Sequence, residues 1–182
     1  IHGAFRGSMW LDSYAARSGF DRFIAQEDFA GWREISDGTW GVYDEYALER
    51  LQRELVDSPK PVFAFLFSLG PHTPFELPDA RFRKFGAGVP NAGMLNAFAY
   101  TDAALGRFFE WARGSDYWRD TVFLVTADHN MGKGKLDRLS AMWIPLLILD
   151  PGNPAFPAGE TRDTLGSQAD LAPTALEALG LS

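Results

Sequence analysis

Three short, almost entirely apolar runs constrain the fold of this chain more than any other feature of its sequence. They are VFAFLFSLG, TVFLVTA and MWIPLLILD, and they predict strands at 62–69, 121–127 and 142–150. Continuous apolar sequence of this length is typical of strands that are buried on both faces of a parallel sheet. Pro145 in the third run favours an edge strand or a β-bulge, because proline cannot donate a ladder hydrogen bond.

Helical patterns alternate with these runs, at 8–19, 43–56, 94–115 and 167–180. The pattern at 43–56 is amphipathic, with a stripe formed by Tyr43, Ala47, Leu51 and Leu55. The pattern at 94–115 has an apolar stripe formed by Leu95, Phe98, Leu105, Phe108, Phe109 and Ala112. The last helix is expected to begin with a capping box of Ser167 and Asp170. Alternating strands and helices predict an α/β fold, a mostly parallel sheet with helices on both faces.

Composition narrows the possible functions. The chain has 182 residues, enough for one domain with a core, and its net charge of -7 without a long Lys/Arg run argues against nucleic-acid binding. The absence of cysteine excludes disulfides and thiolate metal sites, and it fits an extracytoplasmic setting. No apolar run reaches the length of a membrane span. Because Ile1 already resembles the end of a strand, we expect the chain to be part of a longer protein.

All of the histidines lie where expected strands end. His2 follows the strand-like Ile1, His72 follows the strand at 62–69, and His129 follows the strand at 121–127. Ligands of parallel α/β sheets bind beyond the carboxyl ends of the strands. The sequence therefore predicts a functional site at this edge of the sheet.

Asp128 and His129 stand side by side at the end of the second strand. A carboxylate and a neutral imidazole are suitable ligands for manganese, zinc or a similar divalent cation. Beyond the end of a strand both side chains are free to turn towards one ion. The alternative is that Asp128 caps a turn and His129 is its hydrogen-bonded neighbour, since such residues also favour turns.

The other candidate residues have equally plain alternatives. His72, between two prolines, would contact an anionic substrate or protonate a leaving oxygen, or it is an exposed loop residue. Trp10 would line a pocket or pack in the core. Lys133 and Lys135 would bind a phosphate group or simply remain solvated.

Taken together, the motifs resemble those of the sulfatase and alkaline-phosphatase superfamily. FSLGPHTPFELP, YTDAALGRFFEW, TVFLVTADHNMG, IPLLILDPG and SQADLAPTALEALGL occur in that superfamily's order, across essentially the whole chain. The opening, with IHG, a tryptophan, GFDRFI and WGVYDEY, resembles the branch of lipoteichoic acid synthases and phosphoglycerol transferases. The resemblance implies an alkaline-phosphatase-like fold, here incomplete, with 1–182 as the C-terminal part of one catalytic domain.

The resemblance also implies roles for individual residues. Asp128 and His129 match the family's late metal-ligand pair, and manganese is the metal expected, with zinc, magnesium or calcium as alternatives. His72 matches a substrate-contacting histidine, and His2 and Trp10 resemble residues that flank the head-group pocket. The substrate implied is a phospholipid or glycan of the bacterial cell envelope, and the implied full-length protein is a membrane-anchored, extracytoplasmic enzyme.

Several family features are different or missing. Asp12 stands where phosphoglycerol transferases have an arginine, with Arg6 as a weak substitute, and Asn130 replaces the glycine after the metal-ligand pair. The family's early metal-binding acid and its threonine, serine or cysteine nucleophile are expected upstream of Ile1. The main interpretation is a phosphoglycerol-type transferase that uses a covalent intermediate. Two alternatives are a sulfatase or phosphodiesterase hydrolase and a non-catalytic binding domain with a decayed site.

Overall fold

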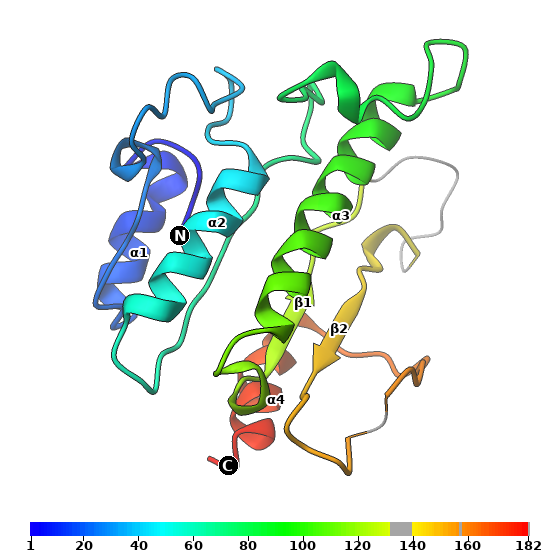
Figure 1. The fold of residues 1–182 in the computed structure, drawn as a ribbon. Helices are drawn as coiled ribbons and strands as arrows, with labels where there is room; N and C mark the ends of the chain where they lie inside the picture. The colour runs from blue at the N-terminus through cyan, green and yellow to red at the C-terminus, as the bar shows by residue number, and fades with distance from the viewer. Residues whose placement is uncertain (132–139, 157, 182) are drawn as a thin grey trace. The chain divides into compact units, whose positions relative to one another are not determined.

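The computed structural model describes residues 1–131, 140–156 and 158–181. The chain divides into two compact units, Ile1–Ala112 and Arg113–Ser182. The first unit contains the helices labelled α1, α2 and α3, of which α3 extends one residue beyond it, and the second contains β1, β2 and α4 (Figure 1). Among the described residues, no helix is both long enough and apolar enough to cross a membrane.

Helices α1 (Leu11–Arg17) and α2 (Asp44–Asp57) confirm the helices predicted at 8–19 and 43–56. The first turn of α2 carries two acidic residues, which interact favourably with the positive end of the helix dipole. Its buried face consists of Asp44, Ala47, Leu48, Leu51 and Leu55. Three of the four residues in the predicted stripe are therefore buried, and the helix ends just before Pro59.

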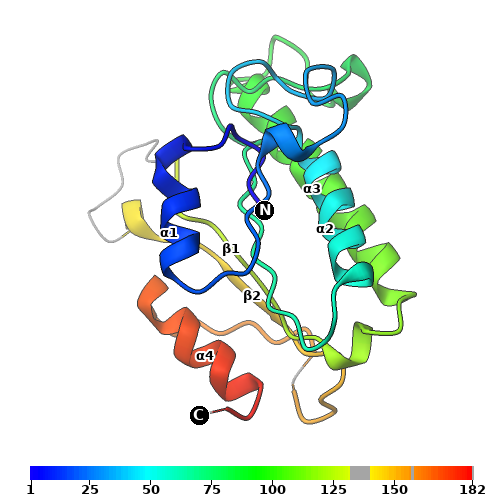
Figure 2. The same ribbon diagram turned by 90° about the vertical axis from the view of Figure 1, so that its left-hand side faces the viewer.

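Helix α3 (Ala92–Arg113) confirms the predicted third helix, but its buried face is rotated from the one expected. The buried residues are Asn96, Ala97, Tyr100, Ala104, Phe108 and Ala112. Phe98, which was expected in the core, is 43% exposed. Ala104 and Phe108 of this face line a pocket together with residues of α2, and the two helices run side by side in Figures 1 and 2. Arg107 of α3 donates to Glu45 of α2 at 2.9 Å.

The run at 62–69 is extended, but it does not form the doubly buried strand that was predicted. It makes a parallel bridge between Phe67 and His2, with hydrogen bonds from Ile1 N to Phe65 O at 2.7 Å and from Phe67 N to Ile1 O at 3.0 Å. Phe63 is 70% exposed and Phe65 is 54% exposed. The prediction of burial on both faces is therefore wrong for these side chains, although the parallel direction of the pairing agrees with the expectation.

The carboxylate of Asp44 fastens the end of this extended run to both long helices. Asp44 is 1% exposed, and its Oδ1 accepts hydrogen bonds from Leu69 N at 3.0 Å and Gly70 N at 3.1 Å. Its Oδ2 accepts a hydrogen bond from Thr101 Oγ1 of α3 at 2.7 Å. Three donors thus compensate for the loss of water around a buried charge.

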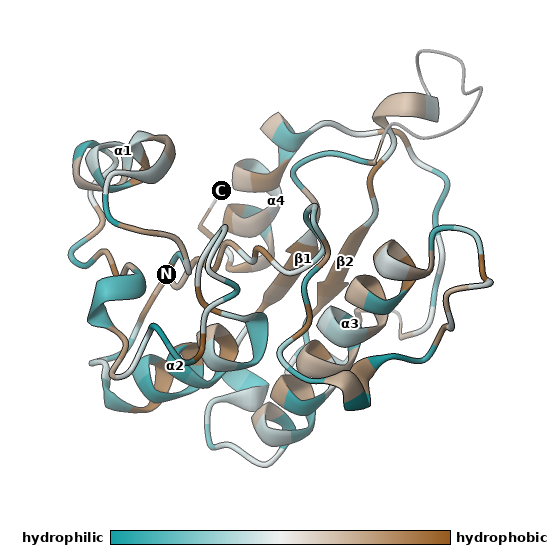
Figure 3. Cartoon of the chain, turned by 90° about the horizontal axis from the view of Figure 1, so that it is seen from above, coloured by the Kyte–Doolittle hydropathy of each residue, from teal (hydrophilic) through white to brown (hydrophobic). Residues whose placement is uncertain are grey.

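The second unit contains a two-stranded sheet and a helix. Strands β1 (Phe123–Thr126) and β2 (Leu146–Leu149) pair with Phe123 opposite Leu149. Both strands are strongly hydrophobic in Figure 3. Their pairing is antiparallel, which differs from the prevailing direction of the mostly parallel sheet that was predicted. Pro145 lies just before β2, where it removes no ladder donor, and its carbonyl accepts from Thr126 Oγ1 at 2.7 Å.

Helix α4 (Leu171–Ala178) follows a short 3-10 turn, Gln168–Asp170. Ser167 N donates to Asp170 Oδ2 at 2.6 Å, and Asp170 N donates to Ser167 O at 2.9 Å. The predicted pairing of Ser167 with Asp170 is confirmed, and it fixes the direction in which the chain enters the helix.

Replacing Gly70 with alanine tests whether the Asp44 contact stabilises the first unit. A methyl group at this position would overlap the Asp44 carboxylate and would lie 2.7 Å from Thr101 Oγ1. We expect Gly70→Ala to lower the free energy of unfolding by about 2 kcal/mol, the typical cost of overpacking, in a urea titration. Gly86→Ala is the matched control because nothing lies within 4 Å of its added carbon. Equal stability of the two variants would contradict the role given to Asp44.

Candidate functional site

Asp128 and His129 follow β1, which ends at Thr126. His129 N donates to Asp128 Oδ1 at 2.8 Å, and His129 Nε2 lies 3.6 Å from Asp128 Oδ2. The side chain of Asp128 is 52% exposed and that of His129 is 66% exposed. The structure therefore places the predicted pair together at the end of a strand, facing one another and open to solvent.

The ring of His129 is oriented by the backbone carbonyl of the next residue, Asn130. Its Nδ1 lies 2.8 Å from Asn130 O, and because a carbonyl oxygen only accepts, Nδ1 must donate in this hydrogen bond. In the neutral ring, Nε2 then carries the lone pair and faces the Asp128 carboxylate. Metal-bound histidines commonly have this arrangement, in which the second nitrogen donates to a carbonyl or carboxylate group.

The donor set of this pair fits a divalent metal. One carboxylate and one imidazole nitrogen that approach each other and remain accessible can bind one ion. Within residues 1–131, 140–156 and 158–181 there is no group of three or more potential metal-binding side chains. Asp128 and His129 would therefore supply two ligands, fewer than the usual four or more.

Gln168 secures the backbone that carries the pair. Its Nε2 donates to Asp128 O at 2.7 Å and to Ala127 O at 3.2 Å. Gln168 belongs to the 3-10 turn before α4, so this turn anchors the end of β1 from a position 40 residues away. This residue was not predicted from the sequence, because no local pattern in SQADLAP distinguishes it from an ordinary helix start.

His72 lies in the first unit, just beyond the backbone that Asp44 holds. His72 N donates to Leu69 O at 3.2 Å, and the His72 carbonyl accepts from Phe75 N at 2.8 Å. The side chain is exposed, as a contact to an incoming substrate requires. Its ring lies against Trp40, with the centroids 3.9 Å apart and the planes inclined by 51°. Trp40 was not predicted from the sequence either.

His2 is in the interior of the first unit. It is 1% exposed and its ring lies 5.3 Å from that of Phe67. In the part of the chain that the structure describes, neither ring nitrogen has a hydrogen-bond partner. Burial lowers the pKa of His2 from its ordinary value of 6.5, because a charged ring is poorly solvated there. The predicted substrate-binding residue therefore lies beneath the surface, beside the segment that leads to His72.

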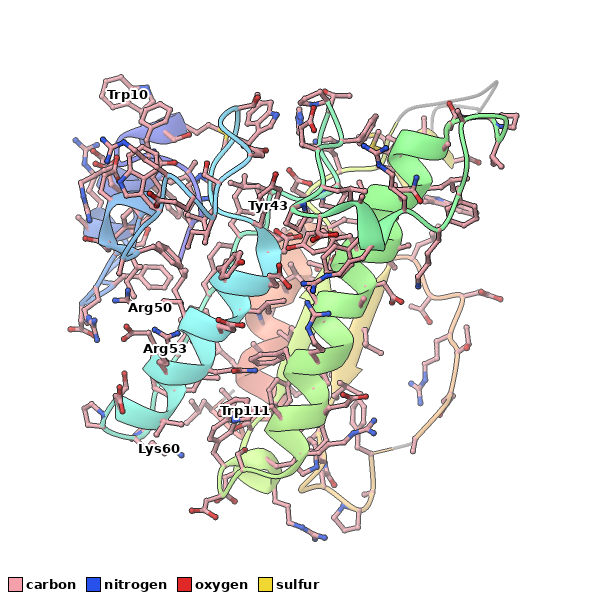
Figure 4. All side chains as sticks on the ribbon, turned by 45° about the horizontal axis from the view of Figure 1, so that its top comes forward. Trp10, Tyr43, Arg50, Arg53, Lys60 and Trp111 are labelled. Carbon is pink, nitrogen blue, oxygen red and sulfur yellow. The ribbon has the colours of Figure 1, made fainter. Side chains whose placement is uncertain are left out.

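Trp10 has the opposite environment. It is 78% exposed and points away from the chain in Figure 4. Its φ of 58° and that of Met9, 50°, are both in the left-handed region, which bulky residues rarely adopt. The core interpretation of Trp10 is therefore wrong, and an exposed pocket wall remains a prediction. Arg6, the suggested substitute for the missing arginine, donates to Asp28 at 2.5 Å.

The candidate residues are divided between the two units. His2, Trp10 and His72 belong to the first, whereas Asp128 and His129 belong to the second. Lys133 and Lys135, the predicted phosphate contacts, lie outside the described residues.

Comparison with known proteins identifies the family. The Sulfatase family model matches residues 1–181, and the chain belongs to this family. Among curated relatives, it is 25% identical to lipoteichoic acid synthase-like YvgJ of Bacillus subtilis over 90% of this chain, and 25% identical to lipoteichoic acid synthase 1 of the same organism over 100%. The chain spans 29% and 30% of the length of these two relatives.

Solved structures confirm the fold class. A protein in the alkaline phosphatase superfamily from Vibrio parahaemolyticus matches with a TM-score of 0.68 and 29% identity, over 82% of this chain and 37% of that one. The lipoteichoic acid synthase LtaP from Listeria monocytogenes matches with a TM-score of 0.68 and 19% identity, over 84% and 43%. The predicted α/β, alkaline-phosphatase-like fold is therefore confirmed, as is the resemblance to the lipoteichoic acid synthase branch.

The burial of His2 predicts a pH dependence of stability. Because the pKa of His2 is lowered on folding, the unfolded chain binds more protons between the folded pKa and 6.5. The contribution of His2 to stability is thus fully present above pH 6.5 and is lost as pH falls through the folded pKa. His2→Leu should weaken this loss in urea titrations from pH 8 to pH 5, about the range where histidine titrates. Identical pH profiles for variant and parent would refute it.

Proposed function

We propose that this chain is the part of a metal-dependent phosphoglycerol-type transferase that carries the metal-ligand pair Asp128 and His129. The observation that supports this most strongly is the geometry of that pair, with Nε2 of His129 turned 3.6 Å from Asp128 Oδ2 after the end of β1. Membership of the Sulfatase family and similarity to lipoteichoic acid synthases support the reaction class. Manganese is the metal we expect, with zinc, magnesium or calcium as alternatives.

In this proposal, a hydroxyl or other nucleophile from outside this sequence attacks the phosphorus of a phosphodiester, and the bond to the leaving alcohol breaks. The bound metal would lower the pKa of the attacking hydroxyl and neutralise charge on the ester oxygens. Asp128 and His129 would hold the metal, and Gln168 fixes the backbone beneath them. His72 exchanges a proton with the alcohol oxygen that leaves or enters.

The acceptor in this proposal is an alcohol of an envelope lipid or glycan, and the complete protein works at the extracytoplasmic side of the bacterial membrane. The names of the two lipoteichoic acid synthase relatives support this location. A hydrolase of the same family would use water as acceptor instead, and product analysis with and without an added alcohol separates the two.

Two observations favour a second candidate, a binding domain with a decayed site. Asp12 is acidic where an anion-binding arginine is expected, and Arg6 is already paired with Asp28. This candidate predicts no turnover by the complete protein with any metal.

Removal of His129 tests the metal site. In the full-length protein, His129→Ala should lose its bound metal, and its turnover should fall at least about 100-fold. Even residues that only orient metal ligands contribute about 10- to 100-fold to metal affinity or activity. Metal content is measured by atomic spectroscopy and turnover by release of 4-nitrophenol from an aryl phosphodiester. Glu177→Ala, which removes an exposed side chain of the same unit, is the control and should change neither. Full metal content in His129→Ala would exclude it as a ligand.

Removal of His72 tests whether this residue acts on the substrate and not on the metal. His72→Ala should lower kcat by about 100-fold, the typical contribution of general acid–base catalysis, while metal content stays at the parent level. Both quantities are measured on the same preparation of full-length protein. A parallel loss of metal would show that His72 supports the metal site instead of contacting the substrate.

A further inference from the structure

An exposed histidine at the start of a loop is ordinarily free to rotate, yet His72 is held from one side by an aromatic residue distant in sequence. The ring centroids of Trp40 and His72 are 3.9 Å apart. Trp40 Nε1 donates to the carbonyl of Thr73, the next residue after His72, at 2.5 Å. The ring contact and the hydrogen bond come from the same indole, whose N–H is its single donor. Trp40 therefore touches both the ring of His72 and the backbone beside it.

Thr73 O favours the tautomer of His72 that carries its proton on Nδ1. It lies 3.0 Å from Nδ1, nearer than Thr73 Oγ1 at 3.3 Å, and because the carbonyl only accepts whereas the hydroxyl can also accept, both contacts are satisfied when Nδ1 donates. A carbonyl oxygen has two lone pairs, so it can accept from Trp40 Nε1 and His72 Nδ1 together. The neutral ring then has its lone pair on Nε2, the nitrogen that can take a proton from an alcohol.

Trp40 itself is held in a tight turn. Asp37 Oδ1 accepts from the backbone N–H groups of Thr39, Trp40 and Gly41 at 2.8, 2.7 and 3.0 Å. Gly41 has a φ of 148°, and a side chain there would overlap the carbonyl of Gly3. The backbone on both sides of Trp40 is thus fixed before the indole meets the His72 loop, as a positioning residue requires.

We propose that Trp40 is a positioning residue for the transfer reaction, which holds the His72 imidazole in one ring orientation and one tautomer. This inference rests on the proposed function, because it needs His72 to exchange a proton with the substrate. The indole contributes to turnover only through His72. Its removal leaves the ring free to rotate and the Thr73 carbonyl free to move, so fewer encounters find Nε2 unprotonated and facing the substrate.

A double-mutant cycle in the full-length protein tests this coupling, with release of 4-nitrophenol from an aryl phosphodiester of glycerol as the assay. Trp40→Leu should lower kcat about 10-fold, equivalent to about 1.4 kcal/mol, and change KM less than about 2-fold. In the His72→Ala background the same change should alter kcat less than about 2-fold. If the kcat of the double variant falls by the product of the two single effects, the proposal is overturned, while the role of His72 stays intact.

Two further variants separate positioning from general packing. Trp40→Phe keeps an aromatic ring at this position but loses the N–H, so it should retain more activity than Trp40→Leu. Trp32→Leu removes a half-buried indole that packs on Ile24, Phe29 and Val42, and it should reduce stability without the kcat effect. Equal kcat losses in Trp32→Leu and Trp40→Leu would overturn the proposal.

The tautomer of His72 supplies a readout that packing alone would not change. Nitrogen-15 spectra of histidine-labelled full-length protein, with the His72 signal assigned by its loss in His72→Ala, should show an unprotonated Nε2 in the parent. Trp40→Leu should give a mixture of tautomers at the same pH. An unchanged tautomer in this variant would overturn the proposal. An unchanged kcat in His72→Ala would instead remove the proposed function of His72 itself.

Discussion

A single buried carboxylate organises the first unit. Asp44 lies in the first turn of α2 and accepts from Leu69 N, Gly70 N and Thr101 Oγ1 at 3.0, 3.1 and 2.7 Å. A buried charge is tolerated only when such donors replace its lost water, so the carboxylate ties both helices to the end of the 62–69 run. His72 follows Gly70 by two residues, and the same contact therefore determines where its loop begins.

Local periodicity was enough to predict the helices, but it did not identify the buried face of α3. The pattern placed Phe98 inside because it is apolar, whereas the structure buries Asn96. Asn96 Oδ1 accepts from the N–H groups of Lys84 and Phe85 at 2.8 Å each, and its Nδ2 donates to Phe85 O at 2.9 Å. An amide with three hydrogen bonds can be buried at little cost, and a count of apolar residues cannot detect it.

The sequence revealed the candidate site residues that adjoin strand ends, and missed those that act across long distances. Asp128 and His129 are neighbours in the chain, so their proximity could be inferred directly. Trp40 reaches Thr73 across 33 residues, and Gln168 reaches Asp128 across 40. Both contacts join a side chain to a backbone carbonyl, and no residue type at the acceptor end marks such a contact in the sequence. Strand pairing is equally non-local, which explains why the antiparallel pairing of β1 with β2 was not predicted.

His72 and His129, the two histidines outside the core, make the same backbone hydrogen bond but have different groups beside the ring. In each, Nδ1 donates to the next carbonyl along the chain, Thr73 O for His72 and Asn130 O for His129. Nε2 is thus the basic nitrogen in both neutral rings. Beside His129 stands the carboxylate of Asp128, which adds an anionic oxygen donor suited to a cation. Beside His72 stands the indole of Trp40, which brings no ligand atom and leaves the nitrogen available for proton exchange. In the proposed function, the same backbone contact therefore orients a metal ligand in one unit and an acid–base group in the other.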